Sequence, residues 1–219
     1  MIKNIIPTEE GFTTTYDHTC IERTVAEYDK SVRVYYTDGS EKEVHVVVDS
    51  FHAQYGLSVS EDGQYLLVPD WDKGRLFCYN IDKDTLAWKL PVKKICGMVV
   101  YEDNVVCLSS GKCLTVVSIE HGKAIKEEKL SAESLFALNT ELFMVGPVRN
   151  NWQIRKMENL DIVQTISEKE VNPNDCFSFL LNSAALDGQE LVIEGFEQDE
   201  DDALLGKPMT PYSRRITLK

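Results

Sequence analysis

The fold is decided by residues 55–90, which read YGLSVSEDGQYLLVPDWDKGRLFCYNIDKDTLAWKL. Four short apolar segments alternate here with polar turns, at residues 55–60, 65–68, 75–81 and 86–90. The first turn contains Asp62-Gly63, and such a pair supplies the positive φ that tight hairpin turns require. Four antiparallel strands fit into about 40 residues at this spacing. The segment therefore predicts one four-stranded antiparallel sheet.

The same order of segments recurs twice downstream. The third strand of each copy ends with an apolar residue followed by an acid, at Ile81-Asp82, Ile119-Glu120 and Met157-Glu158. Neighbouring pairs are 38 residues apart in the sequence. A fixed period of about 40 residues indicates repeated β-sheet units of the kind found in propeller blades.

Five units of this kind account for the chain, and we place them at residues 11–49, 54–90, 95–130, 134–167 and 177–219. The last unit is one strand short, and the apolar segment 2–6 has no partner of its own. We therefore expect one all-β domain, a small five-bladed β-propeller of four-stranded antiparallel blades. In this interpretation the N- and C-terminal strands pair, residues 2–6 with 213–218, which removes an exposed sheet edge.

The repeats resemble the WD-repeat and quinoprotein-like blade families. The segment Ile81-Asp82-Lys83-Asp84-Thr85-Leu86-Ala87-Trp88 is similar to the Asp…Thr-Gly…Trp ending of a quinoprotein repeat, although the Gly is missing and the spacing is shorter. The one Trp-Asp dipeptide, Trp71-Asp72, comes before the third segment of its repeat, and the Gly-His pair of true WD repeats does not occur. The resemblance is closest over residues 55–130 and implies a propeller fold with a binding role. It implies no bound quinone or other cofactor.

The charge of the chain limits its partners. Lys and Arg total 23 against 36 Asp and Glu, so the formal net charge is −13. Nucleic acids and anionic lipids present phosphates that a binder must neutralise, so we expect neither as a partner. A basic partner is compatible with this charge, and solubility alone also explains it. The oligomeric state is left open.

The N-terminus and the cysteines indicate a cytoplasmic protein. Residues 1–7 contain no apolar stretch of the length that a signal peptide needs. Six cysteines occur without a Cys-x-x-Cys pair, so we expect reduced, mostly buried thiols. Cys107 and Cys113 can face each other across a hairpin, which leaves a disulfide there as an alternative.

No segment carries a recognisable catalytic or metal motif. The phosphate loop, the Gly-x-Ser-x-Gly elbow and the His-Glu-x-x-His helix are all absent. The four histidines are scattered, whereas a zinc site needs three or four converging ligands. We therefore predict no catalytic residues, no cofactor and no metal. The acidic run 197–202 is interpreted as a solvated loop, with a calcium site or a docking site for a basic partner as alternatives.

The expected working surface is the face that carries the loops between second and third strands. Loop residues collect there although they are scattered in the sequence, and aromatic and Arg side chains are frequent interface anchors. The residues that we predict to bind the partner are Tyr28, Trp71, Asp72, Arg149, Asn151 and Trp152. The alternative is that these loop side chains simply seal the ends of the blades.

Two classes of function remain open at this stage. The first is a non-catalytic binding or scaffold module that recognises a partner protein through one loop face. In a bacterial cell, such a small acidic propeller could neutralise a basic toxin. The second is a propeller enzyme, a carbohydrate-active hydrolase or lyase, with carboxylates gathered over a central channel. An enzyme should bring at least two carboxylates together with a His or Arg.

Overall fold

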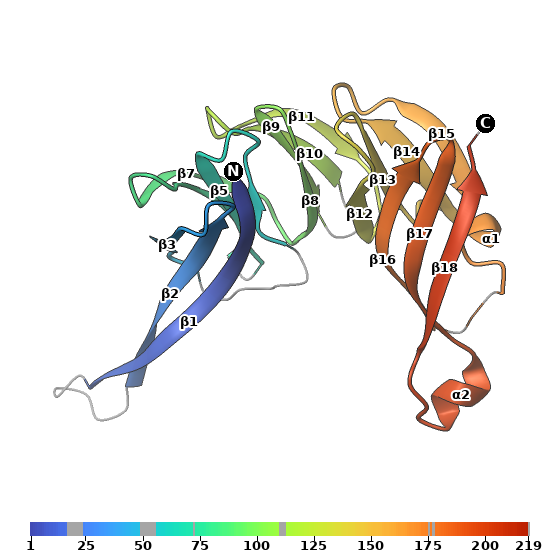
Figure 1. Ribbon diagram of the computed structural model, residues 1–219, viewed down its shortest axis with the longest axis horizontal. Helices are drawn as coiled ribbons and strands as arrows, with labels where there is room; N and C mark the ends of the chain where they lie inside the picture. The colour runs from blue at the N-terminus through green and yellow to red at the C-terminus, as the bar shows by residue number, and fades with distance from the viewer. Residues whose placement is uncertain are drawn as a thin grey trace. The chain divides into compact units, whose positions relative to one another are not determined.

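The computed structural model describes residues 1–16, 24–48, 56–71, 73–109, 113–174, 176 and 178–218, with only the backbone of 4–16 and 24–29. Within these ranges the chain is built almost wholly from β-strands, arranged as five antiparallel sheets of three or four strands (Figure 1). The expectation of an all-β fold is therefore confirmed. Neither helix in the described part of the chain is long and apolar enough to span a membrane.

The strands follow one another in sequence order. The first sheet contains β1 (Ile2–Tyr16), β2 (Thr24–Tyr36) and β3 (Glu41–His45). The second contains β4 (Ser58–Val59), β5 (Tyr65–Asp70), β6 (Arg75–Asn80) and β7 (Thr85–Pro91). The third contains β8 (Ile95–Tyr101), β9 (Asn104–Ser109), β10 (Cys113–Ser118) and β11 (Lys123–Lys129). The fourth contains β12 (Ser134–Ala137), β13 (Leu142–Gly146), β14 (Asn151–Lys156) and β15 (Ile162–Ser167). The fifth contains β16 (Ser178–Asp187), β17 (Glu190–Gln198) and β18 (Thr210–Thr217).

The second, third and fourth sheets are the four-stranded meanders that the repeat predicts. Their second strands, β5, β9 and β13, are buried along nearly their whole length, which means that both faces of each strand are covered. This explains why these strands read as continuous apolar runs such as Leu66-Leu67-Val68, whereas a strand with one solvated face would alternate.

The repeated apolar anchors have a common structural role. Ile81 and Met157 are each at most 2% exposed, and each follows the third strand of its sheet. The N–H of Ile81 donates to the carbonyl of Gln64 at 2.9 Å, and the N–H of Met157 donates to that of Glu141 at 2.8 Å. Each bond ties the end of a third strand to the turn before the second strand of the same sheet.

The same bond identifies the strands of the two outer sheets. The N–H of Leu218, after β18, donates to the carbonyl of Gln189 at 2.8 Å, and that of Thr37, after β2, donates to Met1 at 2.9 Å. β18 and β2 therefore take the place of third strands. It follows that β1 takes the place of a second strand, so the first sheet has second, third and fourth strands.

The structure does not show the predicted pairing of residues 2–6 with residues 213–218, which stays a prediction. The structure pairs residues 2–16 with β2 in one long hairpin, in which Ile5 lies opposite Val34, and each outer sheet has three strands among the described residues (Figure 1). The expected separation of 11–16 from 2–6 is wrong, because β1 continues through both segments. The physical reason is that a long hairpin satisfies the backbone of residues 2–16 locally.

The chain divides into two compact units, residues 1–95 with 118–123, and residues 96–117 with 124–219. The core of the first unit packs valines of β2 and β3 against Leu66, Val68 and Phe77 of the second sheet. The second unit has two clusters, one between the third and fourth sheets and one between the fourth and fifth. The expectation of a single domain stays a prediction, and each unit is described by itself.

A polar contact recurs between successive sheets within each unit. A side chain of the last strand donates to the turn after the third strand of the next sheet. In the first unit, Lys42 Nζ donates to the carbonyl of Asp82 at 2.9 Å, and Trp88 Nε1 donates to the carbonyl of Ile119. In the second unit, Lys126 Nζ donates to the carbonyl of Asn159. Each bond ties a last strand to the turn that it contacts.

Candidate functional site

Two of the predicted partner-binding residues lie together in one groove of about 560 Å³ in the second unit. We call this groove, with all of its lining residues, the basic groove. It is lined by Lys129, Leu130, Ser131, Pro147, Val148, Arg149, Asn151, Gln153 and Thr165. These residues come from the end of β11, its connection to β12, the β13–β14 loop, and strands β14 and β15.

The β13–β14 loop holds Arg149 in a defined position. Val148 and Asn151 exchange two backbone hydrogen bonds, of 2.6 Å and 3.1 Å, across the tip of the loop. Arg149 and Asn150 between them both have positive φ, +49° and +63°. The carbonyl of Asn150 also accepts the N–H of Glu168 at 3.0 Å, which ties the loop to helix α1 (Glu168–Val171). The loop therefore presents an exposed Arg149 on a fixed backbone.

The side of the groove formed by β14 and β15 is an ordered polar surface. Gln153 lies directly opposite Thr165 in the pairing of these strands, so their side chains stand beside each other. Gln153 Oε1 accepts from Arg155 Nε at 2.8 Å and from Arg155 Nη2 at 2.7 Å. Arg155 is 3% exposed and pairs with Glu128 at 2.8 Å. A buried, neutralised guanidinium thus fixes the orientation of the Gln153 amide.

Trp152 does not serve as the exposed anchor that the sequence predicts. Its side chain is 3% exposed, and its Nε1 donates to Glu168 Oε2 at 2.7 Å. The ring lies against Gly146, where an added Cβ would come within 2.7 Å of it. Trp152 and Ile154 face the core from alternate positions of β14, as the two-residue period of a strand requires. Trp152 therefore supports the groove from inside the fold.

The other predicted site residues belong to the first unit. Trp71 is half-buried after β5, and Lys94 Nζ lies 5.8 Å from its ring centroid. Asp72 lies outside the described residues. Tyr28 lies within strand β2, paired with Phe12, so the expectation that it is a loop residue is wrong. The gathering of Trp71 and Arg149 on one face stays a prediction.

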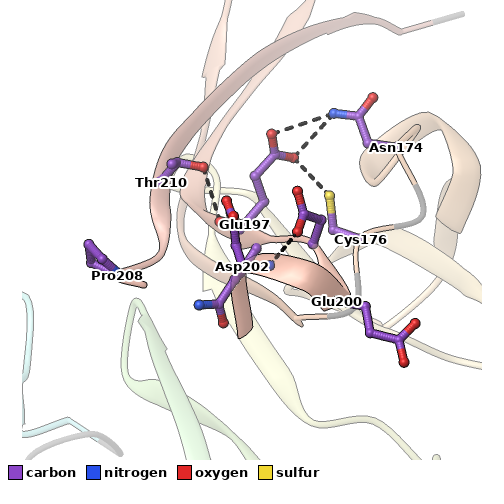
Figure 2. A pocket seen from close by; sticks show the side chains of 9 residues that line it. Asn174, Cys176, Glu197, Glu200, Asp202, Pro208 and Thr210 are labelled. Carbon is purple, nitrogen blue, oxygen red and sulfur yellow. Dashed lines mark hydrogen bonds between the residues drawn. The ribbon is translucent and has the colours of Figure 1, made fainter. Parts of the chain in front are cut away.

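A second pocket, of about 440 Å³, is acidic and lies in the fifth sheet (Figure 2). Glu197 is at its centre and accepts hydrogen bonds from Asn174 Nδ2 at 3.3 Å and Cys176 Sγ at 3.4 Å. Asp202 pairs with Lys207 at 2.5 Å. Part of the acidic run forms helix α2 (Glu200–Leu204), capped by Asp199, rather than the expected open loop. Among the described residues no cluster of His, Cys, Asp and Glu has the arrangement of a metal site.

The shifted pKa values have structural causes. Burial raises the pKa of the Cys78 thiol to about 12, that of Cys107 to about 12 and that of Cys96 to about 11. Since the thiolate is the reactive form, these thiols are poor nucleophiles at neutral pH. Cys107 and Cys113 form no disulfide with each other in the described part of the chain.

The sequence reasoning missed Lys129, Gln153 and Thr165 as groove residues. Lys129 lies near the end of the third predicted unit, residues 95–130. Nothing in the sequence around it connects it with β15, because the two become neighbours only when the third and fourth sheets pack together. Helix α1 was also missed, although a signal for it exists. Ser167 and Glu170 form a capping box, the Ser-x-x-Glu pattern that marks a helix start.

Comparisons with known proteins identify the fold of this chain but not a family. No family model matches the sequence, and no curated protein matches it. Hydrazine synthase from Kuenenia stuttgartiensis is similar in structure, with a TM-score of 0.61 and 13% identity over 86% of this chain and 57% of that chain. BamB from Moraxella catarrhalis gives a TM-score of 0.54 and 10% identity over 97% of this chain and 68% of that chain. The chain thus spans little more than half of the matched hydrazine synthase chain. Both neighbours are β-propeller proteins, so the likeness shows a fold of the β-propeller type.

Proposed function

We propose that this chain is a non-catalytic protein-interaction module of the β-propeller type, which docks a partner protein on the basic groove. The observation that carries the proposal is the groove itself. It combines an exposed Arg on a hydrogen-bonded loop, the oriented amide of Gln153, hydroxyl groups, and an apolar wall of Leu130, Pro147 and Val148. Apolar surface next to oriented polar groups is the composition of a protein interface.

The alternative function, a carbohydrate-active enzyme, has less support than the interaction module. The described lining of the acidic pocket contains several carboxylates but neither a His nor an Arg. The carboxylate at its centre, Glu197, is occupied by hydrogen bonds from Asn174 and Cys176. The basic groove has no carboxylate in its described lining, so it offers no acid–base pair for glycoside chemistry. We therefore do not propose a catalytic function.

Capture of partners from a native lysate tests the proposal when groove variants are compared with matched controls. The test variant is Lys129→Ala with Arg149→Ala. The control is Lys83→Ala with Lys123→Ala, which removes the same charge from two exposed positions outside the groove. We expect the groove variant to weaken capture by about tenfold or more, because Arg is a frequent hot-spot residue. Equal capture by both double variants would refute the groove as the docking site.

We further propose that the five sheets are the blades of one propeller domain. A compact chain of this length should have a radius of gyration of about 17 Å. Small-angle X-ray scattering of the monomer measures this directly. A radius of gyration well above this figure would mean that the two units are separate bodies. The capture test of the groove would not be affected, because the groove lies within one unit.

A further inference from the structure

We infer that the basic groove binds a side-chain carboxylate of an extended acidic segment in the partner. The inference rests on the proposed function and names the ligand chemistry that the groove accepts. The chain as a whole carries a net charge of −13, yet the described lining of this groove contains two cations and no carboxylate. The groove is thus a local exception to the charge of the protein.

The cations of the groove are available to a ligand. Neither Lys129 nor Arg149 forms an ion pair with any residue that the structure describes, and both side chains are exposed. The guanidinium of Arg149 presents a planar fork of N–H donors, which matches the two oxygens of a carboxylate. The hydrogen-bonded loop fixes the backbone of Arg149, so the backbone needs little further ordering when a ligand binds.

The neutral groups of the groove also favour an anion. Both bonds from Arg155 go to Oε1 of Gln153, so the Nε2 group, which can only donate, is left for a ligand. Thr165 lies beside it and adds a hydroxyl donor. The positive charge of Arg155 is already neutralised by Glu128, which leaves Lys129 and Arg149 as the cations that face the ligand.

A polypeptide explains the groove better than a nucleic acid does. Single-stranded nucleic acids bind on aromatic platforms and along tracks of several cations. The described lining offers two cations and no aromatic ring, together with the apolar wall of Leu130, Pro147 and Val148. A carboxylate next to an apolar side chain, as in an Asp-Val sequence, fits this combination. Two acids lie near the groove, but Glu128 is paired with Arg155 and Glu168 accepts from Trp152. At physiological salt, charges beyond about 8 Å are largely screened, so the remaining acids of the chain weaken the local positive charge little.

The test is an NMR titration of the full chain with three probes. They are the peptide acetyl-Ser-Asp-Val-Asp-Ser-amide, its isostere with Asn in place of both Asp residues, and a pentathymidylate. We expect the Asp peptide, at up to millimolar concentration and physiological salt, to shift the side-chain amide signals of Asn151 and Gln153. The Asn peptide and the oligonucleotide should leave these signals in place.

Variants complete the test. Arg149→Gln should weaken binding of the Asp peptide by about tenfold, because hydrogen bonds to charged groups are worth about that factor or more. Lys83→Gln is the control and should not change it, and the remaining spectrum shows whether each variant is folded. Any one of four results would overturn the inference: no shift with the Asp peptide, equal shifts with the Asn peptide, tighter binding of the oligonucleotide, or no effect of Arg149→Gln. Partner capture that depends on the groove despite such a result would leave the proposed function standing and reject the carboxylate.

Discussion

Trp88 lies directly against Gly122: a Cβ built on Gly122 would come within 2.5 Å of the indole ring. The indole Nε1 also donates to the carbonyl of Ile119, three residues earlier. Gly122 has a φ of +62°, which disfavours any side chain, so the turn after the third strand is shaped to receive the tryptophan of the preceding sheet. The two residues join the second sheet to the turn of the third.

This contact predicts a large effect of Gly122→Ala. The variant adds backbone strain and a clash with Trp88, so the free energy of unfolding should fall by about 3 kcal/mol. Gly188→Ala is the matched control, because Gly188 has a φ of +64° and open space around the position of its Cβ. It should lose about 1 kcal/mol. Urea unfolding measures both, and equal losses would show that the Trp88 contact is not formed.

Trp152→Ala should affect stability before it affects partner binding. The side chain is buried beside Gly146 and bonded to Glu168, so its removal leaves a cavity and an unsatisfied carboxylate. We expect a loss of about 3–5 kcal/mol in the free energy of unfolding. Denaturant unfolding followed by circular dichroism checks this. A variant as stable as the wild type would mean that Trp152 is a surface residue after all.

The cysteines should differ in reactivity according to their burial. Cys78 and Cys107 are fully buried thiols with pKa values raised to about 12 by desolvation. We expect both to resist a thiol reagent at pH 8 in the native protein and to react at once in denaturant. Mass spectrometry of the labelled peptides gives the answer for each residue. Rapid native labelling of Cys107 would contradict the described packing of β9.

The Asp84–His45 contact should contribute a pH-dependent part of the stability. Burial raises the pKa of Asp84, but hydrogen bonds from the His45 ring and backbone N–H, each 2.8 Å long, outweigh this and lower it. A carboxyl with a lowered pKa stabilises the fold above its ordinary pKa of about 4, and this stabilisation disappears as the pH falls through the folded-state value.

Asp84→Asn should therefore be less stable than the wild type at pH 7, and the difference should vanish as the pH falls below about 4. Urea unfolding of both proteins at several pH values measures it. A difference that stays constant down to acid pH would assign the effect to packing instead of charge.

How far the sequence predicted the fold can be traced to particular residues. Ile81, Ile119 and Met157 recur at a fixed interval, because each third strand is followed by a buried apolar residue at the start of a turn, and this period identified three sheets correctly. The first sheet has no comparable marker. An apolar segment such as residues 2–6 can form backbone hydrogen bonds with any strand, and the sequence contains no signal that selects β2 over β18 as its partner.

The sequence predicted only those residues of the candidate site that lie on one local segment. Arg149 and Asn151 sit on a turn with polar residues, which is visible in the sequence. Lys129 and Thr165 join them through the packing of neighbouring sheets, which no local pattern encodes. Trp152 was misplaced because it was assigned to the loop, although the alternation of Trp152 and Ile154 with Gln153 indicates an inward-facing strand position.

Site-specific photo-crosslinking tests the central claim, that a partner protein docks on the basic groove, most directly. A benzophenone amino acid replaces Val148 in the groove wall or, as the control, Leu86, which is 46% exposed on β7. Irradiation in native lysate should give one defined crosslinked species from position 148, and Arg149→Ala should abolish it. Crosslinks of equal yield from both positions, or from position 86 alone, would contradict the account.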